Sequence, residues 1–136
     1  MADLKLVIGV KEGKSYQKEL KSPEADAFLK KRIGDNINGD EFGFPGYEFL
    51  ITGGSDKCGF PMRKGIQFHR KKILTGQGVG FCGKDRNGKK QFGLVRRRTV
   101  CGERITSIIR QVNLKVVKAG AQPLGGEAAT EPKSEE

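Results

Sequence analysis

Glycine interrupts this chain so often that long regular elements are excluded from most of it. The 136 residues include 20 glycines, about twice the share of roughly 7% that is usual in proteins. Between the glycines stand short runs rich in β-branched and aromatic residues, which is the pattern of short strands joined by turns. A chain of this length suits one domain of ordinary size. We therefore expect a mainly β fold, a small antiparallel β-barrel formed by residues 1–120.

Local patterns predict the order of the elements. Residues 4–10 and 15–20 are strand-like runs separated by a turn, so they should form a hairpin. From Ser22, apolar residues recur at helical spacing after a serine cap and a proline, which predicts one short α-helix over 22–32. Residues 35–46 have the composition of a long loop. Further strands are expected at 47–52, ended by Gly53 and Gly54, and at 66–74, 78–82, 91–99, 105–109 and 112–118.

Several features bear on cellular location. The longest apolar run, residues 6–10, is far shorter than the roughly 18 residues that span a bilayer. The first residues do not have the basic-then-apolar order of a secretory signal, so we expect a cytoplasmic protein. Three cysteines, Cys58, Cys82 and Cys101, are odd in number and widely spaced, which favours free thiols in a reducing compartment. Residues 121–136 are acidic with little to bury, and we expect them to be a disordered tail.

Charge is distributed very unevenly. The formal net charge is +10, of which residues 1–50 contribute −1, residues 51–120 contribute +14 and residues 121–136 contribute −3. So large a positive charge repels itself in a folded domain, and its simplest purpose is to be neutralised by a polyanion. Nucleic acid is the favoured polyanion, because the chain lacks the basic amphipathic helix or lipidation signal that would indicate a membrane surface.

The basic residues of this half fall in five clusters with few acids to offset them. A single charge run is usually a solvated surface, but five in one half favour phosphate binding. Arginine adds a planar fork that grips phosphate at two points. In strands, alternation places Arg96 and Arg98 on one face and Arg97 on the other. The predicted RNA-binding residues are Lys57, Arg63, Lys64, Arg70, Lys71, Lys72, Lys84, Arg86, Lys89, Lys90, Arg96, Arg97, Arg98, Arg104 and Arg110.

Catalysis and metal binding are poorly supported. His69 is the only histidine and lies among basic residues, where it favours solvent or phosphate over a role as general base. With the three cysteines it would make four zinc ligands, but no Cys-x-x-Cys pair is present. Residues 78–83 match G-x-G-x-x-G, yet a turn rather than a helix follows, so no dinucleotide site is expected. We predict no enzyme activity, cofactor, metal or small-molecule substrate.

One stretch, GGSDKCGFPMRKG at 53–65, closely resembles a family signature. It is similar to the eukaryotic-type ribosomal protein S6e family of the small subunit, in its short archaeal form. The resemblance covers about residues 3–120. It includes GYEFLIT at 46–52, GVGF at 78–81, RRRTV at 96–100 and QVNLKVV at 111–117.

The signature also has a physical interpretation. Asp56 can bond its own backbone in an Asx-turn, Pro61 stiffens the segment, and Phe60 and Met62 are expected to plug one end of the barrel. Two positions depart from the family pattern. Cys101 and Glu103 stand where basic and small polar residues are expected, so we predict no phosphate contact at either. The chain also lacks the long basic carboxy-terminal helix with clustered serines of eukaryotic members, so their phosphorylation is not inferred.

The resemblance implies a structural constituent of the small ribosomal subunit that binds ribosomal RNA (rRNA) and contacts neighbouring ribosomal proteins. Two alternatives remain at this point. A free-standing RNA-binding β-barrel, such as a chaperone or assembly factor, fits the charge equally well. The scarcity of aromatic residues in the basic half argues against it, because such proteins stack bases on aromatic side chains. The second alternative is an enzyme acting on RNA through His69.

Overall fold

Within residues 3–121 and 124, which the computed structural model describes, the chain forms seven strands and two short 3-10 helices. The order is β1 (Leu4–Gly9), β2 (Ser15–Leu20), η1 (Glu24–Phe28), β3 (Asn36–Asn38), η2 (Gly39–Phe42), β4 (Glu48–Asp56), β5 (Arg70–Thr75), β6 (Arg96–Cys101) and β7 (Ile109–Lys118). The expected mainly β fold is therefore confirmed. No helix in this described part is long and apolar enough to cross a membrane.

The first two strands form the predicted hairpin. Antiparallel pairing runs from Leu4 opposite Leu20 to Gly9 opposite Ser15. In β1 every second residue, Leu4, Leu6 and Ile8, is buried, which is the period of a strand with one face on the core. Gly13 closes the turn with a φ of 88°, a value that side chains other than glycine rarely adopt.

The main sheet is open, so the predicted antiparallel barrel is wrong. Five strands pair in the order β2-β1-β7-β4-β3, which leaves β2 and β3 as edges, and β5 with β6 form a separate two-stranded sheet. The central pair, β1 and β7, is parallel, with Leu6 opposite Val112. Pairing of the first strand with the last depends on contacts about 100 residues apart, and local patterns carry no information about it.

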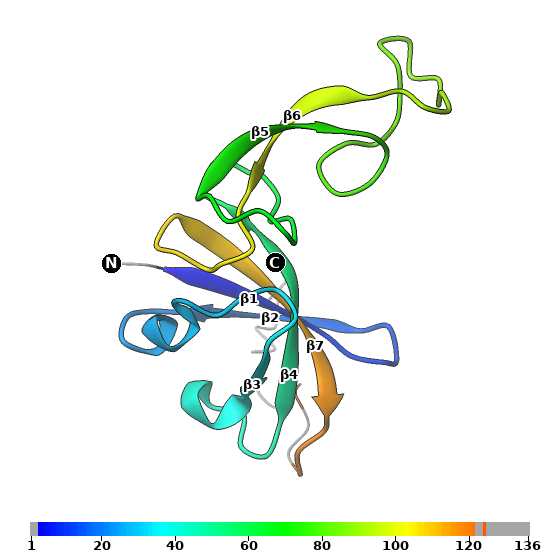
Figure 1. The fold of residues 1–136 in the computed structure, drawn as a ribbon. Helices are drawn as coiled ribbons and strands as arrows, with labels where there is room; N and C mark the ends of the chain where they lie inside the picture. Colours follow the sequence, from blue (N-terminus) through cyan, green and yellow to red (C-terminus); the bar gives the residue numbers. More distant parts are fainter. Residues whose placement is uncertain (1–2, 122–123, 125–136) are drawn as a thin grey trace, which may run out of the picture.

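The core lies on one face of this sheet. Phe49 of β4, Ile8 of β1 and Val112 of β7 are almost fully buried there. The segment between β2 and β4 covers them, and both 3-10 helices lie on this side of the sheet (Figure 1, blue and cyan coils). Phe28 of η1 and Phe42 of η2 pack with ring centroids 5.0 Å apart. Aromatic packing thus closes a core that has a sheet on one side only.

The predicted α-helix over 22–32 is wrong; only the 3-10 helix η1 forms. After Phe28 the backbone is extended at Leu29 and left-handed at Lys30, whose φ is 71°. The chain leaves the helix to pair with a distant segment: the Lys30 N–H donates to the Ile105 carbonyl at 3.1 Å, and the Ile105 N–H donates to Lys31 at 2.9 Å. These backbone hydrogen bonds to a distant segment outweigh the helical propensity of residues 22–32, because a helix of only eleven residues is marginally stable by itself.

Other boundaries also shift. The expected loop at 35–46 contains β3 and η2, and the expected strands at 78–82 and 105–109 are irregular. Gly53 and Gly54 do not end a strand but lie inside β4, where the register with β7 is irregular beside Gly53. A Cβ at Gly54 would overlap the Gln111 carbonyl oxygen, so glycine permits the close approach of the two strands there.

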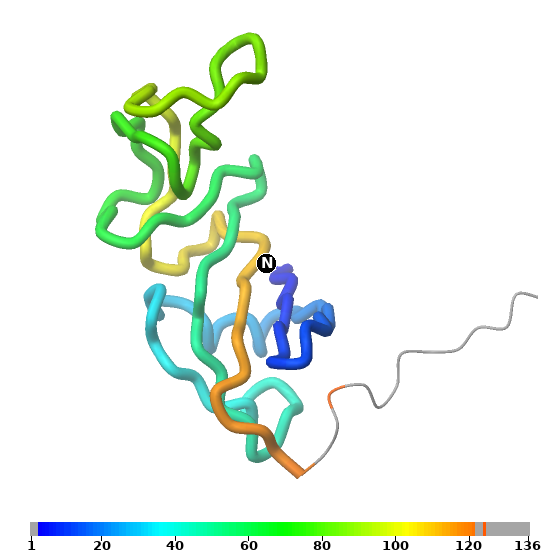
Figure 2. Tube along the Cα trace, turned by 90° about the vertical axis from the view of Figure 1, so that its right-hand side faces the viewer, coloured from blue at the N-terminus to red at the C-terminus, as the bar shows by residue number. Residues whose placement is uncertain are grey.

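The second sheet forms a projection. We call residues 66–101 the basic arm; it contains β5, β6 and the long connection between them, and it extends away from the main sheet in both views (Figure 1 and Figure 2). Its apolar interior is small: Phe81 and Val100 are buried but lie outside the main core cluster. Polar contacts must therefore hold much of the arm.

The predicted tail falls largely outside the described residues. Of residues 121–136, only Ala121 and Leu124 are described, and Leu124 packs against the core cluster. The disorder of the tail and the domain boundary at residue 120 stay predictions.

Candidate nucleic-acid interface

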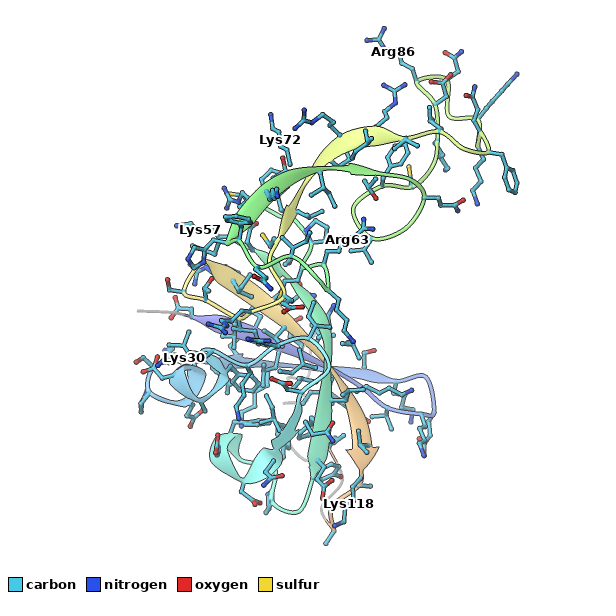
Figure 3. The ribbon with its side chains drawn as sticks, viewed as in Figure 1. Lys30, Lys57, Arg63, Lys72, Arg86 and Lys118 are labelled. Carbon is cyan, nitrogen blue, oxygen red and sulfur yellow. The ribbon has the colours of Figure 1, made fainter. Side chains whose placement is uncertain are left out.

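The fifteen predicted RNA-binding residues lie on the basic arm or at its root, which we define as residues 57–65 and 102–110. The arm has ten lysines and arginines and a single acid, Asp85. Figure 3 shows Lys72 and Arg86 on the outer side of the arm and Arg63 beneath it. The structure thus places ten of the fifteen residues on the projecting arm and the other five at its root.

The root is built around the buried carboxylate of Asp56, the last residue of β4. Its Oδ1 accepts hydrogen bonds from the Cys58 N–H at 2.8 Å and the Phe60 N–H at 3.0 Å, which confirms the predicted Asx-turn. Its Oδ2 accepts from the Arg70 guanidinium of β5 and from the Cys101 thiol of β6, the latter at 3.2 Å. One carboxylate therefore binds the loop, β5 and β6 together.

Proton affinity in this cluster follows from its contacts. Burial raises the pKa of the Asp56 carboxyl, but hydrogen bonds from Cys101, Phe60 and Arg70 outweigh burial and hold that pKa below its ordinary value. Burial, reinforced by the hydrogen bond to Asp56, raises the pKa of the Cys101 thiol to about 11. At neutral pH the cluster is a carboxylate receiving a hydrogen bond from a protonated thiol.

Arg63 forms a second link between the root and the arm, beside the Asp56–Arg70 pair. Its guanidinium donates to the Thr75 hydroxyl at 2.6 Å and to the Val79 carbonyl at 3.2 Å, and so joins the root to the far end of β5. Met62, next to it, is buried in the main core and Phe60 packs against that core. The barrel end that these two apolar side chains were expected to plug does not exist, because the main sheet is open; both side chains instead pack in or against its core.

The two faces of the β5–β6 sheet differ in accessibility. Arg96 and Arg98 share one face, as predicted, and both contact the connecting segment: Arg96 pairs with Asp85 at 3.2 Å, and Arg98 lies over the Phe81 ring at 5.2 Å. Arg97 is on the opposite face, across from Leu74, and its side chain is exposed. The arginine triplet therefore has two residues engaged within the arm and one directed outward.

The tip of the arm carries a tight turn. The Asp85 N–H donates to the Lys89 carbonyl at 2.8 Å, and Gly88 has a φ of 80°, which agrees with the turn expected after residues 78–83. Lys84 and Lys90 flank the turn as a β-bridge.

In the part of the chain that the structure describes, no intramolecular ion pair or side-chain hydrogen bond forms at the exposed cations Lys57, Lys64, Lys72, Lys84, Arg86, Lys89, Lys90, Arg97 and Arg104.

At the base of the arm, an open hollow of about 330 Å³ is lined by Arg32, Arg104, Phe68 and His69, among others. Glu103 is engaged here: it faces Arg32 at 3.8 Å and accepts from the Gly65 N–H at 2.9 Å. Glu103 thus has partners within the fold and Cys101 is buried, while the absence of a phosphate contact at either residue stays a prediction.

Arg110, the last of the predicted RNA-binding residues, is the second residue of β7 and is exposed. Its guanidinium faces the Asp3 carboxylate at 3.3 Å and also donates to the Asp3 carbonyl at 3.0 Å. Like Arg63, Arg70 and Arg96, it therefore has a hydrogen-bond partner within the protein.

Aromatic residues are few in the basic half, as the sequence shows, but two of them are exposed. Phe68 is 64% exposed, with Lys71 over its ring at 4.9 Å, and Phe92 is fully exposed. Phe92 follows two lysines and stands between Gln91 and Gly93, and this polar setting before the ring could have indicated that it points outward.

Neither catalytic nor metal-binding geometry emerges among the described side chains. His69 is exposed, and the four candidate zinc ligands do not gather: no group of three or more His, Cys, Asp or Glu is placed to hold an ion in that part of the chain. The three cysteines are free thiols, with Cys58 and Cys82 exposed and Cys101 buried. At 78–83 the chain turns through a Gly78–Phe81 bridge, and the next described element is the strand β6 rather than a helix.

Comparison with known proteins gives a consistent result. A family model described as ribosomal protein S6e matches residues 4–128. The chain is 39% identical over 137 residues to the small ribosomal subunit protein eS6 of Methanocella arvoryzae, covering 99% of this chain and 92% of that protein. It is 43% identical over 128 residues to the protein of the same name from Methanococcus maripaludis strain C5, covering 93% and 96%. The corresponding Thermoplasma acidophilum protein is 39% identical over 120 residues, covering 88% and 91%.

Proposed function

This chain belongs to the ribosomal protein S6e family, and on that premise we propose that it is a structural constituent of the small ribosomal subunit that binds rRNA through its basic arm and root. The family consists of structural ribosomal proteins of the cytoplasm and not of enzymes. Neighbouring ribosomal proteins are further expected contacts within the subunit.

One observation supports the RNA-binding part most directly: the unpaired cations concentrate on the projecting arm. Lys72 and Arg97 lie on the face of the β5–β6 sheet opposite Arg96 and Arg98, which we call the open face of the arm. Lys89 and Lys90 stand at the tip of the arm. The single acid of the arm, Asp85, is occupied by Arg96 and Gln91. With no internal partners, these cations are available to replace the counterions of an RNA backbone.

The binding mechanism we propose combines charge neutralisation with shape. Phosphate contacts fix the position and orientation of the protein on RNA but carry little sequence information. Double-stranded RNA is likewise recognised mainly through its backbone and form. The arm holds cations from two strands and a turn at fixed separations, so it would select an RNA surface whose phosphates match that spacing.

The fold divides the fifteen basic residues between two roles. Arg63, Arg70, Arg96 and Arg110 donate to Thr75, Asp56, Asp85 and Asp3, and they hold the arm and root in position. The remaining eleven are the residues that we propose to contact phosphate. An arginine with an internal partner can still reach RNA, but it would add less to the affinity because it first gives up or shares that partner.

Sedimentation of native extract through a density gradient tests this proposal. We expect the protein to travel with the small subunit and to be released by ribonuclease or by high salt, because phosphate contacts weaken as salt rises. A protein that stays at the top of the gradient under all conditions would contradict the role of subunit constituent. Binding to RNA in solution by that free protein would favour the chaperone or assembly-factor alternative.

A further inference from the structure

The exposed apolar side chains are concentrated on the same arm as the cations. Among the described residues, the large apolar side chains that stand exposed are Phe68, Leu74, Val79, Phe92, Val95 and Val117, and all but Val117 lie between positions 68 and 95. Isolated exposed apolar residues are common, but a concentration on one projection indicates an interaction surface. The largest single exposure belongs to Phe92, whose ring is fully exposed.

The backbone that carries Phe92 is held on its amino-terminal side. The Gln91 N–H donates to the Gly83 carbonyl at 3.2 Å, and the Gln91 side-chain amide donates to Asp85 Oδ2 at 3.3 Å. On its other side, Gly93 turns the chain with a φ of 74°. The ring is therefore presented to solvent from a bonded position, which lowers the entropy lost when a partner covers it.

The charge around the ring identifies the kind of partner. Lys89 and Lys90 precede it and have no internal ion-pair partner, while Asp85 already faces Arg96. The surface thus combines an aromatic face with flanking positive charge. A nucleic-acid strand offers the complement of both features, a planar base and phosphates on either side, and aromatic rings beside cations bind single strands in this way.

We propose that Phe92 stacks on an unpaired base of the small-subunit rRNA while Lys89 and Lys90 contact the adjoining phosphates. This inference rests on the proposed function, because it assumes that the arm binds rRNA. Stacking on a lone phenyl ring accepts any base, since every base has a π face. The contact would therefore anchor the tip at a loop or bulge, where bases are unstacked, rather than select a sequence.

Binding of the full chain to protein-free small-subunit rRNA, measured over a range of salt concentrations, tests the stacking. We expect Phe92→Leu to weaken binding about fivefold or more with an unchanged salt dependence, because stacking contributes about 1–3 kcal/mol per base without releasing counterions. Phe92→Tyr should bind like the parent, because it keeps the ring. Val117→Ala, which alters the exposed apolar residue on β7 away from the arm, is the control and should leave binding unchanged.

A photoreactive benzoylphenylalanine at position 92 in assembled subunits locates the partner directly, and we expect a cross-link to RNA. A cross-link only to a ribosomal protein would overturn the proposal. So would a Phe92→Leu variant that enters subunits poorly yet binds protein-free rRNA normally, or one that equals the parent in both measurements. If the parent neither binds rRNA nor enters subunits, the proposed function itself has failed, which separates the two results.

Discussion

The Arg70 guanidinium of β5 pairs with the Asp56 carboxylate at the end of β4, and the Asp56 side chain is completely buried beneath it. This pair joins the main sheet to the basic arm. Because the apolar interior of the arm is small, this pair, the bonds of Arg63 and the backbone hydrogen bonds between the root and Cys101 together hold its position. A surface that must match phosphates in space, as we propose for the arm, needs such a rigid attachment.

Replacing Asp56 by Ala should destabilise the protein by about 3 kcal/mol, near the lower end of the range for breaking a buried ion pair, because Arg70 keeps access to water. The change also leaves two backbone N–H groups and the Cys101 thiol without an acceptor. Urea unfolding followed by circular dichroism measures the effect. The matched control is Asp85→Ala, whose partly exposed pair should cost less than about 1 kcal/mol. Equal losses in the two variants would contradict the role of Asp56.

The Asp56 contribution should depend on pH in a defined direction. Because the folded state holds the pKa of this carboxyl below its ordinary value of about 3.9, the unfolded chain takes up the proton first as pH falls. The free energy of unfolding that Asp56 contributes is therefore fully present above about pH 4 and is lost as pH falls below it. Urea midpoints of the parent and Asp56→Asn should converge in that range. A difference that stays constant down to acidic pH would exclude this account.

The three thiols should differ sharply in reactivity. Cys58 and Cys82 are exposed, whereas Cys101 is buried and its pKa is raised to about 11, so little of it is the reactive thiolate at neutral pH. Titration with Ellman's reagent should label two thiols in the native protein and the third only after unfolding. Cys101→Ser should preserve the two rapid reactions, and rapid labelling of all three native thiols would disagree with the buried cluster.

Adjacent glycines in β4 should respond differently to substitution. Gly54→Ala brings a methyl group into the Gln111 carbonyl of β7, and we expect a loss of about 1–3 kcal/mol from overpacking. Gly53→Ala meets no atom within 4 Å, so its effect should stay within about 0.5 kcal/mol. Thermal or urea unfolding compares the two directly, and a larger loss at Gly53 would contradict the close approach seen between β4 and β7.

The outward arginine of the triplet should contribute more to the salt dependence of rRNA binding than its neighbour. Arg97→Ala should lower the slope of log affinity against log salt by about 0.7–0.9, the value for one lost phosphate contact. Arg96→Ala should lower it less, because Arg96 is already paired with Asp85. Filter binding to small-subunit rRNA at several salt concentrations measures both slopes. Identical slopes for the parent and Arg97→Ala would mean that the open face of the arm is only solvated.

Local patterns predicted several elements of the fold correctly. The β1–β2 hairpin, the Asx-turn at Asp56 and the opposite faces of Arg96 and Arg97 each depend on residues close together in the chain, where period and turn chemistry apply. The predicted helix failed because its residues form backbone bonds with Ile105, which no local pattern reports. The prediction of a barrel was wrong for a related reason, because the pairing of β1 with β7 joins residues from nearly opposite ends of the described chain.

The sequence by itself determined that this chain is a mainly β protein with its positive charge gathered in one half, because strand period, glycine turns and net charge are properties of neighbouring residues. Only the tertiary structure decided which cations are available. Arg96 and Arg97 are adjacent and chemically identical, yet one pairs with Asp85 and the other faces solvent. Likewise, Phe81 is buried and Phe92 exposed within the same arm. Burial and pairing depend on distances between residues far apart in the chain, and those distances exist only once the strands have assembled.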